Sequence, residues 1–203
     1  MTEWLALILL VPAVVVPLVL LFGFAGCGAT LADDVLEKVF ASVMTGDAKE
    51  PNQCLVQRIE PSRLFNSGTV VRITLERPTS GDMVIHRAFI SHADDAPGAN
   101  PYDSAADPTA VPLSQALVIP ADPGNGVVGL PAVVFTLDAQ KPLLLAFDIG
   151  SAGFVRFAPA PNTDATAFFG PLWEASERER SAGYRPENRI YLVNRIEVPP
   201  EGS

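Results

Sequence analysis

The amino-acid sequence predicts a mainly β protein: a two-sheet antiparallel sandwich, similar to a jelly roll, preceded by one transmembrane helix and a short amphipathic helix. Three observations support this fold class. Residues 4–25 are almost wholly apolar, residues 54–198 hold segments in which apolar and polar side chains alternate, and 19 prolines and 15 glycines supply frequent turns. Alternation with a period of two is typical of a strand with one buried face. We expect an anchor over 1–29, an amphipathic helix and linker over 30–52, and a β-sandwich domain over 53–203.

The apolar run at the N-terminus is long enough to cross a membrane. A helix needs roughly 20 apolar residues to span a hydrocarbon core of about 30 Å, and no charged residue lies between Trp4 and Ala32. A cleaved secretory signal has a basic start and a shorter apolar core, whereas this chain begins Met-Thr-Glu. We therefore expect a retained span. A lipoprotein anchored through Cys27, in the lipobox-like sequence Phe-Ala-Gly-Cys, is the main alternative, and a buried soluble helix is a further one.

The charge of the chain restricts its partners. The formal net charge is -9, which argues against nucleic acid because phosphate contacts require Lys and Arg. It argues equally against an anionic lipid surface. The bilayer around the span and an integral membrane protein docked against it are the partners that we expect. Lys and Arg near the span are too few to orient it. By analogy with surface sandwiches, we expect the soluble domain to be periplasmic or extracellular.

A helical pattern follows the apolar run. Leu31, Val35, Val39 and Val43 recur every four residues, and Gly46 is a suitable helix terminator. This spacing predicts an amphipathic helix that ends near Gly46, followed by a polar linker that reaches residue 53.

Beyond the linker, the period-two pattern predicts eight strands. Turn residues such as Gly68 and Gly81 separate several of them. The expected strands are 54–60, 70–76, 83–91, 113–119, 127–137, 143–149, 154–158 and 189–198. Residues 171–183 break the pattern, and Glu174 and Arg178 stand four residues apart, which favours a short helix there.

The long loop at residues 92–112 is the best candidate for a ligand-binding site. Loops at the end of a sandwich commonly carry binding residues, and polar side chains together with a stacking aromatic suit a sugar. The candidate residues are Asp94, Asp95, Asn100, Tyr102, Asp103 and Asp107. Carboxylates in a flexible loop also suit calcium, but their spacing matches no calcium loop, and we expect indifference to calcium.

Catalytic chemistry has no support in the sequence. His86 and His92 would lie roughly 20 Å apart on one strand, which is too far for a shared metal ion. No nucleophile elbow, phosphate loop or cofactor motif is present, and we expect Trp173 and its aromatic neighbours in the core or an interface. We expect a membrane-anchored sandwich that acts as a non-enzymatic accessory or scaffold subunit. A cell-surface glycan-binding module using the loop at 92–112 is the alternative.

Overall fold

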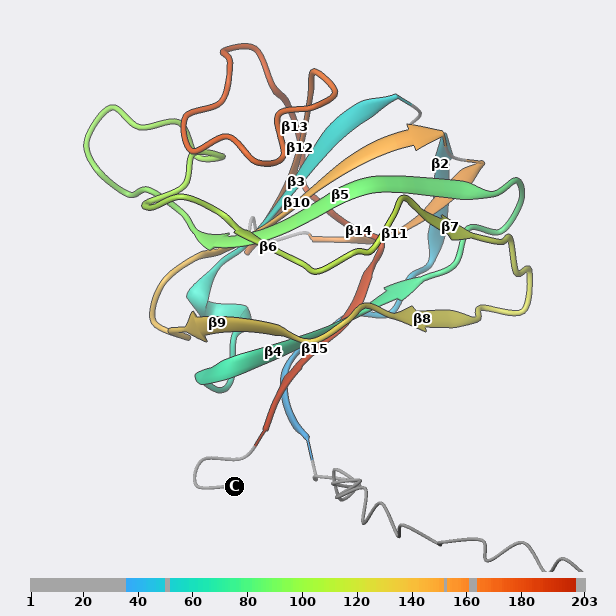
Figure 1. Ribbon diagram of the computed structural model, residues 1–203, viewed down its shortest axis with the longest axis horizontal. Helices are drawn as coiled ribbons and strands as arrows, with labels where there is room; N and C mark the ends of the chain where they lie inside the picture. Colours follow the sequence, from blue (N-terminus) through green and yellow to red (C-terminus); the bar gives the residue numbers. More distant parts are fainter. Residues whose placement is uncertain (1–35, 50–51, 152, 161–163, 200–203) are drawn as a thin grey trace, which may run out of the picture. The chain divides into compact units, whose positions relative to one another are not determined.

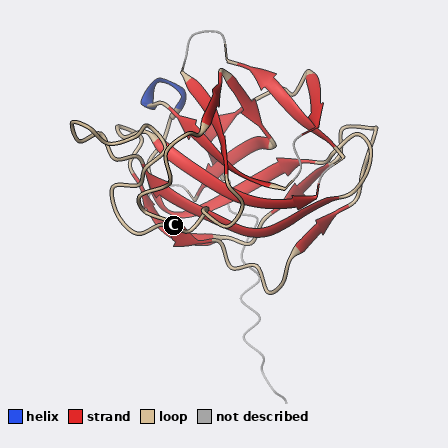
Figure 2. Ribbon diagram, turned by 90° about the horizontal axis from the view of Figure 1, so that it is seen from above, coloured by secondary structure: helices blue, strands red, loops and turns tan. Residues whose placement is uncertain are grey.

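Strands account for most of the structure, which is a computed structural model that describes residues 36–49, 52–151, 153–160 and 164–199. These residues all belong to the unit Asp33–Ser203. Every strand pairing within them is antiparallel. Among the described residues the one helical segment is a single 3₁₀ turn, η1 (Pro61–Arg63) (Figure 2). The mainly β class predicted from the alternating pattern is therefore confirmed.

The first sheet has five strands in the order β1-β15-β4-β8, with β9 also paired to β4. In Figure 1 it forms the lower layer. Its strands are β1 (Glu37–Ala41), β4 (Gly68–Glu76), β8 (Val127–Gly129), β9 (Val133–Leu137) and β15 (Val193–Val198).

The second sheet has seven strands in the order β13-β12-β3-β10-β5-β6, with β7 also paired to β5. It forms the upper layer of Figure 1. Its strands are β3 (Gln53–Ile59), β5 (Met83–His92), β6 (Thr109–Ala110), β7 (Leu117–Ile119), β10 (Leu143–Ser151), β12 (Ala165–Gly170) and β13 (Arg185–Glu187).

A third sheet of three strands has the order β14-β11-β2. It contains β2 (Gly46–Lys49), β11 (Phe154–Pro159) and β14 (Arg189–Tyr191). Its apolar residues Val155 and Ile190 belong to the same buried cluster as Ile73 of the five-stranded sheet and Phe147 of the seven-stranded sheet. One main core therefore serves all three sheets, and burial of its apolar surface is the dominant stabilising contribution.

The amphipathic helix predicted to end near Gly46 is wrong over its described part, because residues 37–41 form β1 and residues 46–49 form β2. The register of β1 against β15 shifts between Lys38 and Phe40. This irregularity lets the adjacent Val39 and Phe40 both be fully buried, which breaks the period of two. β1 and β2 thus extend the folded unit N-terminal of residue 53, where we expected it to begin.

Most of the other expected strands are confirmed, since β3, β4, β5, β10 and β11 match their predictions within two residues at either end. The expected strand 127–137 is divided before Pro131, which cannot donate a backbone hydrogen bond. The strand 189–198 is divided at Leu192, whose φ is 61°. The segment 171–183 forms turns and bends, so the short helix predicted there is wrong.

The predicted membrane anchor over residues 1–29, including Cys27, lies outside the described residues, as does the first part of the predicted amphipathic helix. Within the part of the chain that the structure describes, no helix has the length and apolar character needed to cross a membrane.

Replacing Phe40 with Ala should lower the free energy of unfolding by about 3–5 kcal/mol, because it leaves a cavity where β1 enters the core. Phe40 is 0% exposed, whereas Phe65 is 65% exposed. Phe65→Ala is therefore the matched control, and we expect a change within about 0.5 kcal/mol. Urea titration of the full-length protein in detergent micelles measures both. Equal effects of the two substitutions would contradict the assignment of β1 to the core.

Candidate functional site

The seven-stranded sheet has apolar side chains on both faces. One face joins the main core through Leu55, Leu145 and Phe147. The opposite face forms a second buried cluster around Val56 and Leu144. Two loops, residues 93–108 and 171–184, cover this second face, and we call them the cap; Figure 1 shows both loops above the sheet. The cap includes much of the predicted site loop.

A buried carboxylate on β10 holds one loop of the cap in place. Asp148 is 0% exposed, and its Oδ2 accepts a hydrogen bond of 2.7 Å from Arg87 Nε. Its Oδ1 accepts the backbone N–H groups of Trp173, at 2.8 Å, and Ala175, at 3.3 Å. Burying a carboxylate is costly unless it is paired and hydrogen-bonded. Together with Arg87, the two loop N–H groups therefore offset the cost of burying Asp148, and the same bonds hold the loop to β10.

A buried guanidinium joins the two loops of the cap. Arg180 is 4% exposed, and burial lowers the pKa of its guanidinium. Its backbone N–H donates to Asp103 Oδ1 at 2.9 Å. The guanidinium donates to the carbonyl oxygens of Tyr102, Glu174 and Ala175. The charged side chain of Arg180 therefore binds groups inside the protein and joins the two loops of the cap.

A thiol and a phenol lie beneath the cap. Cys54 is 0% exposed, and burial raises the pKa of its thiol from 9.0 to about 12. The hydroxyl of Tyr184 donates to Glu174 Oε2 at 3.1 Å, and burial also raises the pKa of Tyr184. Because the thiolate is the nucleophilic form, burial disfavours a nucleophilic role for Cys54.

Tyr102 and Asp103, two of the predicted site residues, point into the cap. Tyr102 is 6% exposed, and its ring stacks on Tyr184 with 4.5 Å between centroids. Sugar stacking by Tyr102, the alternative role that the sequence suggested, would require a ring face that is here buried against Tyr184. Asp103, 5% exposed, accepts the N–H of Arg180 and the side-chain amide of Asn100. Both residues hold the loop together.

Asp94 and Asp95 do line an open hollow. This hollow, of about 380 Å³, also includes Arg58, Glu60 and Thr166. Arg58 Nη2 lies 3.0 Å from Asp95 Oδ1 and Arg58 Nε lies 2.5 Å from Glu60 Oε1. A neighbouring hollow of about 370 Å³ contains Asp94, Asn100 and Asp103. Asp107 is exposed and lines neither of these two hollows.

The structure adds residues that the sequence did not single out. Arg58 and Thr166 come from β3 and β12, and only the pairing of these two strands brings them to the loop. No sequence motif marks Arg58 or Thr166.

The histidine at the end of β5, His92, bonds to the backbone. Its Nε2 accepts a hydrogen bond of 3.1 Å from the backbone N–H of Asp138, so His92 has a structural role. Within the described ranges, no three metal-binding side chains of His, Cys, Asp or Glu gather at one point.

In comparisons with known proteins, no family model matches this chain and no curated protein matches it in sequence. The arguments about its function therefore stand on its residues and geometry.

Replacing Asp148 with Ala should lower the free energy of unfolding by about 2–4 kcal/mol, because Arg87 and two loop N–H groups lose their acceptor. Asp107→Ala is the control, since Asp107 is exposed, and we expect it to leave stability unchanged. Urea titration measures the difference. If both variants unfold at the same urea concentration, the buried carboxylate does not hold the cap.

Stability should also fall at high pH. Because the fold raises the pKa of Cys54 to about 12, the unfolded chain loses this proton first. The contribution is complete below pH 9 and is lost as the pH rises from 9 towards 12, by at most about 1.4 kcal/mol per pH unit. Urea titrations at pH 8 and pH 10 should therefore show a smaller decrease in Cys54→Ala than in the natural chain. Identical decreases would contradict this reasoning.

Proposed function

We propose that the chain is a single-pass membrane protein whose β-sandwich acts as a non-enzymatic accessory or scaffold subunit of a membrane-associated complex. Its soluble domain is periplasmic or extracellular in this proposal. The observation that carries it is the run of apolar residues from Trp4 to Ala25, whose length matches a bilayer span.

The short connection between the apolar run and the first strand supports this proposal. Ala25 ends the run and β1 begins at Glu37. Twelve residues extend at most about 40 Å, so an anchored chain keeps its sandwich close to the membrane. A partner in the same membrane would then meet the sandwich at a high effective concentration.

The use of the buried ionisable groups supports a structural role. Asp148, Asp103 and Arg180 are buried, and each bonds to a loop of the cap. Catalytic groups, in contrast, are usually aimed into a cleft that a substrate can enter. The polar interior of this domain thus maintains a rigid surface, which is what a scaffold subunit requires.

The double substitution Val14→Arg with Val15→Arg places two arginines in the middle of the apolar run. It should release the protein from membranes, because the insertion of each arginine at this depth costs about 2.5–3.5 kcal/mol of free energy. Val43→Arg is the matched control, since Val43 is 79% exposed. Alkaline extraction followed by immunoblotting measures the membrane-bound fraction. An unchanged fraction in the double variant would contradict a spanning anchor.

Intact-mass analysis of the native protein separates a spanning helix from a lipid anchor. Retention of the apolar run supports the proposal. A chain that begins at Cys27 with added acyl mass, and that leaves the membrane after Cys27→Ser, would establish the lipoprotein instead. Purification of the protein in mild detergent tests the scaffold role. It should recover another membrane protein in a fixed ratio, and recovery of the chain alone would contradict this role.

A glycan-binding module remains the second candidate, supported by the hollow that Asp94 and Asp95 line together with Arg58. Planar carboxylates and a guanidinium can bind the hydroxyls of a sugar. Calorimetric titration with oligosaccharides tests it: Asp95→Ala should abolish binding, whereas Asp107→Ala, at an exposed position, should preserve it. Equal binding by both variants would exclude the hollow.

A further inference from the structure

A bulge in β5 brings two adjacent side chains to the same face of the sheet. Asp148 pairs with Arg87, but the next residue of β10, Ile149, pairs with Ile85. His86 is therefore the additional residue. His86 and Arg87 are both half-buried, whereas Ile85 and Ala88 on either side are buried in the main core. Bulges that redirect a side chain in this way are over-represented at sheet edges and next to active sites.

Trp173 lies beside this bulge in a conformation that large side chains rarely adopt. Its φ is 79°, which costs a residue other than glycine of order 1–3 kcal/mol. The surroundings enforce this conformation: the N–H of Trp173 donates to Asp148 at 2.8 Å, and its carbonyl accepts from Arg87 Nη2 at 2.6 Å. Glycine would adopt this backbone conformation at less cost, so the tryptophan side chain is present here in spite of the strain in its own backbone.

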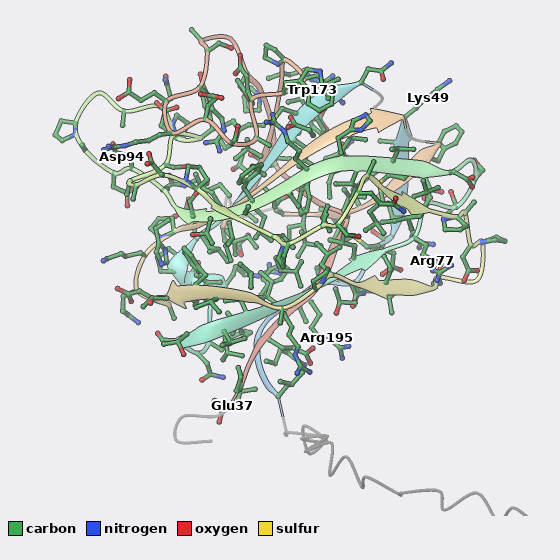
Figure 3. The ribbon with its side chains drawn as sticks, viewed as in Figure 1. Glu37, Lys49, Arg77, Asp94, Trp173 and Arg195 are labelled. Carbon is green, nitrogen blue, oxygen red and sulfur yellow. The ribbon has the colours of Figure 1, made fainter. Side chains whose placement is uncertain are left out.

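The indole is held against polar neighbours and remains open. Trp173 is 51% exposed, and Figure 3 shows its side chain on the cap side of the molecule. Its ring lies 4.8 Å from the His86 ring and 5.3 Å from Arg87 Cζ. Gly150 makes room for the imidazole, because a Cβ there would meet His86 Nε2 at 1.9 Å. The indole is therefore a fixed aromatic group against which the imidazole of His86 lies tilted by 35°.

The charge at this surface is balanced. Arg87 donates to Asp148, to the carbonyl of Trp173 and to the hydroxyl of Ser176, so its charge is paired with the Asp148 carboxylate. Arg87 therefore offers an anionic ligand no uncompensated charge, and the net charge of -9 disfavours anions in general. A neutral ligand with an apolar face and hydroxyl groups suits an indole beside a hydrogen-bonding imidazole.

We propose that Trp173 and His86 form a binding surface for a pyranose sugar with equatorial hydroxyls, whose axial C–H groups stack on the indole while His86 bonds a hydroxyl. Proline-rich peptides are disfavoured because they need a groove lined by several aromatics, and the other strongly exposed aromatics of the described chain, Phe65 and Phe154, lie outside the cap. The proposal does not rest on the membrane anchor, and it uses none of the residues of the Asp94–Asp95 hollow.

Fluorescence can follow this site directly, because Trp4 and Trp173 are the two tryptophans of the chain. In full-length Trp4→Phe protein, in an amine-oxide detergent that carries no sugar, Trp173 is the sole reporter. Titration with cellohexaose and with chitohexaose should give a saturable change in emission for at least one of them. Calorimetry under the same conditions measures the dissociation constant for variants that lack the indole.

Trp173→Gly removes the indole together with its contacts to His86 and Arg87 but relieves the backbone strain, so this variant should still fold. We expect the dissociation constant to rise at least about tenfold in Trp173→Gly and in His86→Ala, and to be unchanged in Phe154→Ala. Three results would overturn the proposal: no saturable change with either sugar, equal affinity in Trp173→Gly, or binding of decaproline in place of the sugars. Loss of affinity in Asp95→Ala but not in Trp173→Gly would assign the sugar to the hollow instead.

Discussion

The double-sided burial of the seven-stranded sheet is the constraint on which the rest of the structure depends. Its central strands β3 and β10 carry apolar side chains on both faces, so a single partner sheet cannot remove all of this surface from water. The five-stranded sheet covers one face. The cap covers the other, although it contains no regular secondary structure within residues 171–184. Irregular loops can serve as a layer here only because their backbone groups find buried partners.

Side chains that bond to backbone groups provide those partners. Asp148 and Asp103 accept N–H groups of the cap, and Arg180 donates to its carbonyls. Side-chain bonds to the backbone also join the seven-stranded sheet to the three-stranded sheet, on the face opposite the cap. There, buried Gln57 of β3 accepts the N–H of Tyr191 at 2.8 Å and donates to the carbonyl of Arg189 at 3.1 Å. Buried polar groups are costly when unpaired, so these bonds fix the position of each layer against the next.

Alternation in the sequence was sufficient to predict strands whose pairing is regular, such as β3 and β10. It failed where the backbone is irregular. The register shift at Val39 and the positive φ of Leu192 both disrupt a period of two, and no local residue pattern indicates either irregularity.

The candidate site was only partly predictable from the sequence for a related reason. Asp94 and Asp95 belong to a conspicuous polar loop, whereas Arg58 reaches them only through strand pairing. Trp173, expected in the core or an interface, is half exposed because Asp148 sets the conformation of its loop.

The central claim is that the cap is a folded layer held by buried charge, which presents a fixed surface on the outside of the seven-stranded sheet. Hydrogen exchange of the backbone amides tests it most directly, since amides in a mobile loop exchange at almost no free-energy cost. The account predicts that the amides of Trp173, Ala175 and Arg180 exchange slowly, as the amides of β10 do, because each bonds to a buried carboxylate. Fast exchange throughout residues 171–184, with β10 still protected, would contradict it.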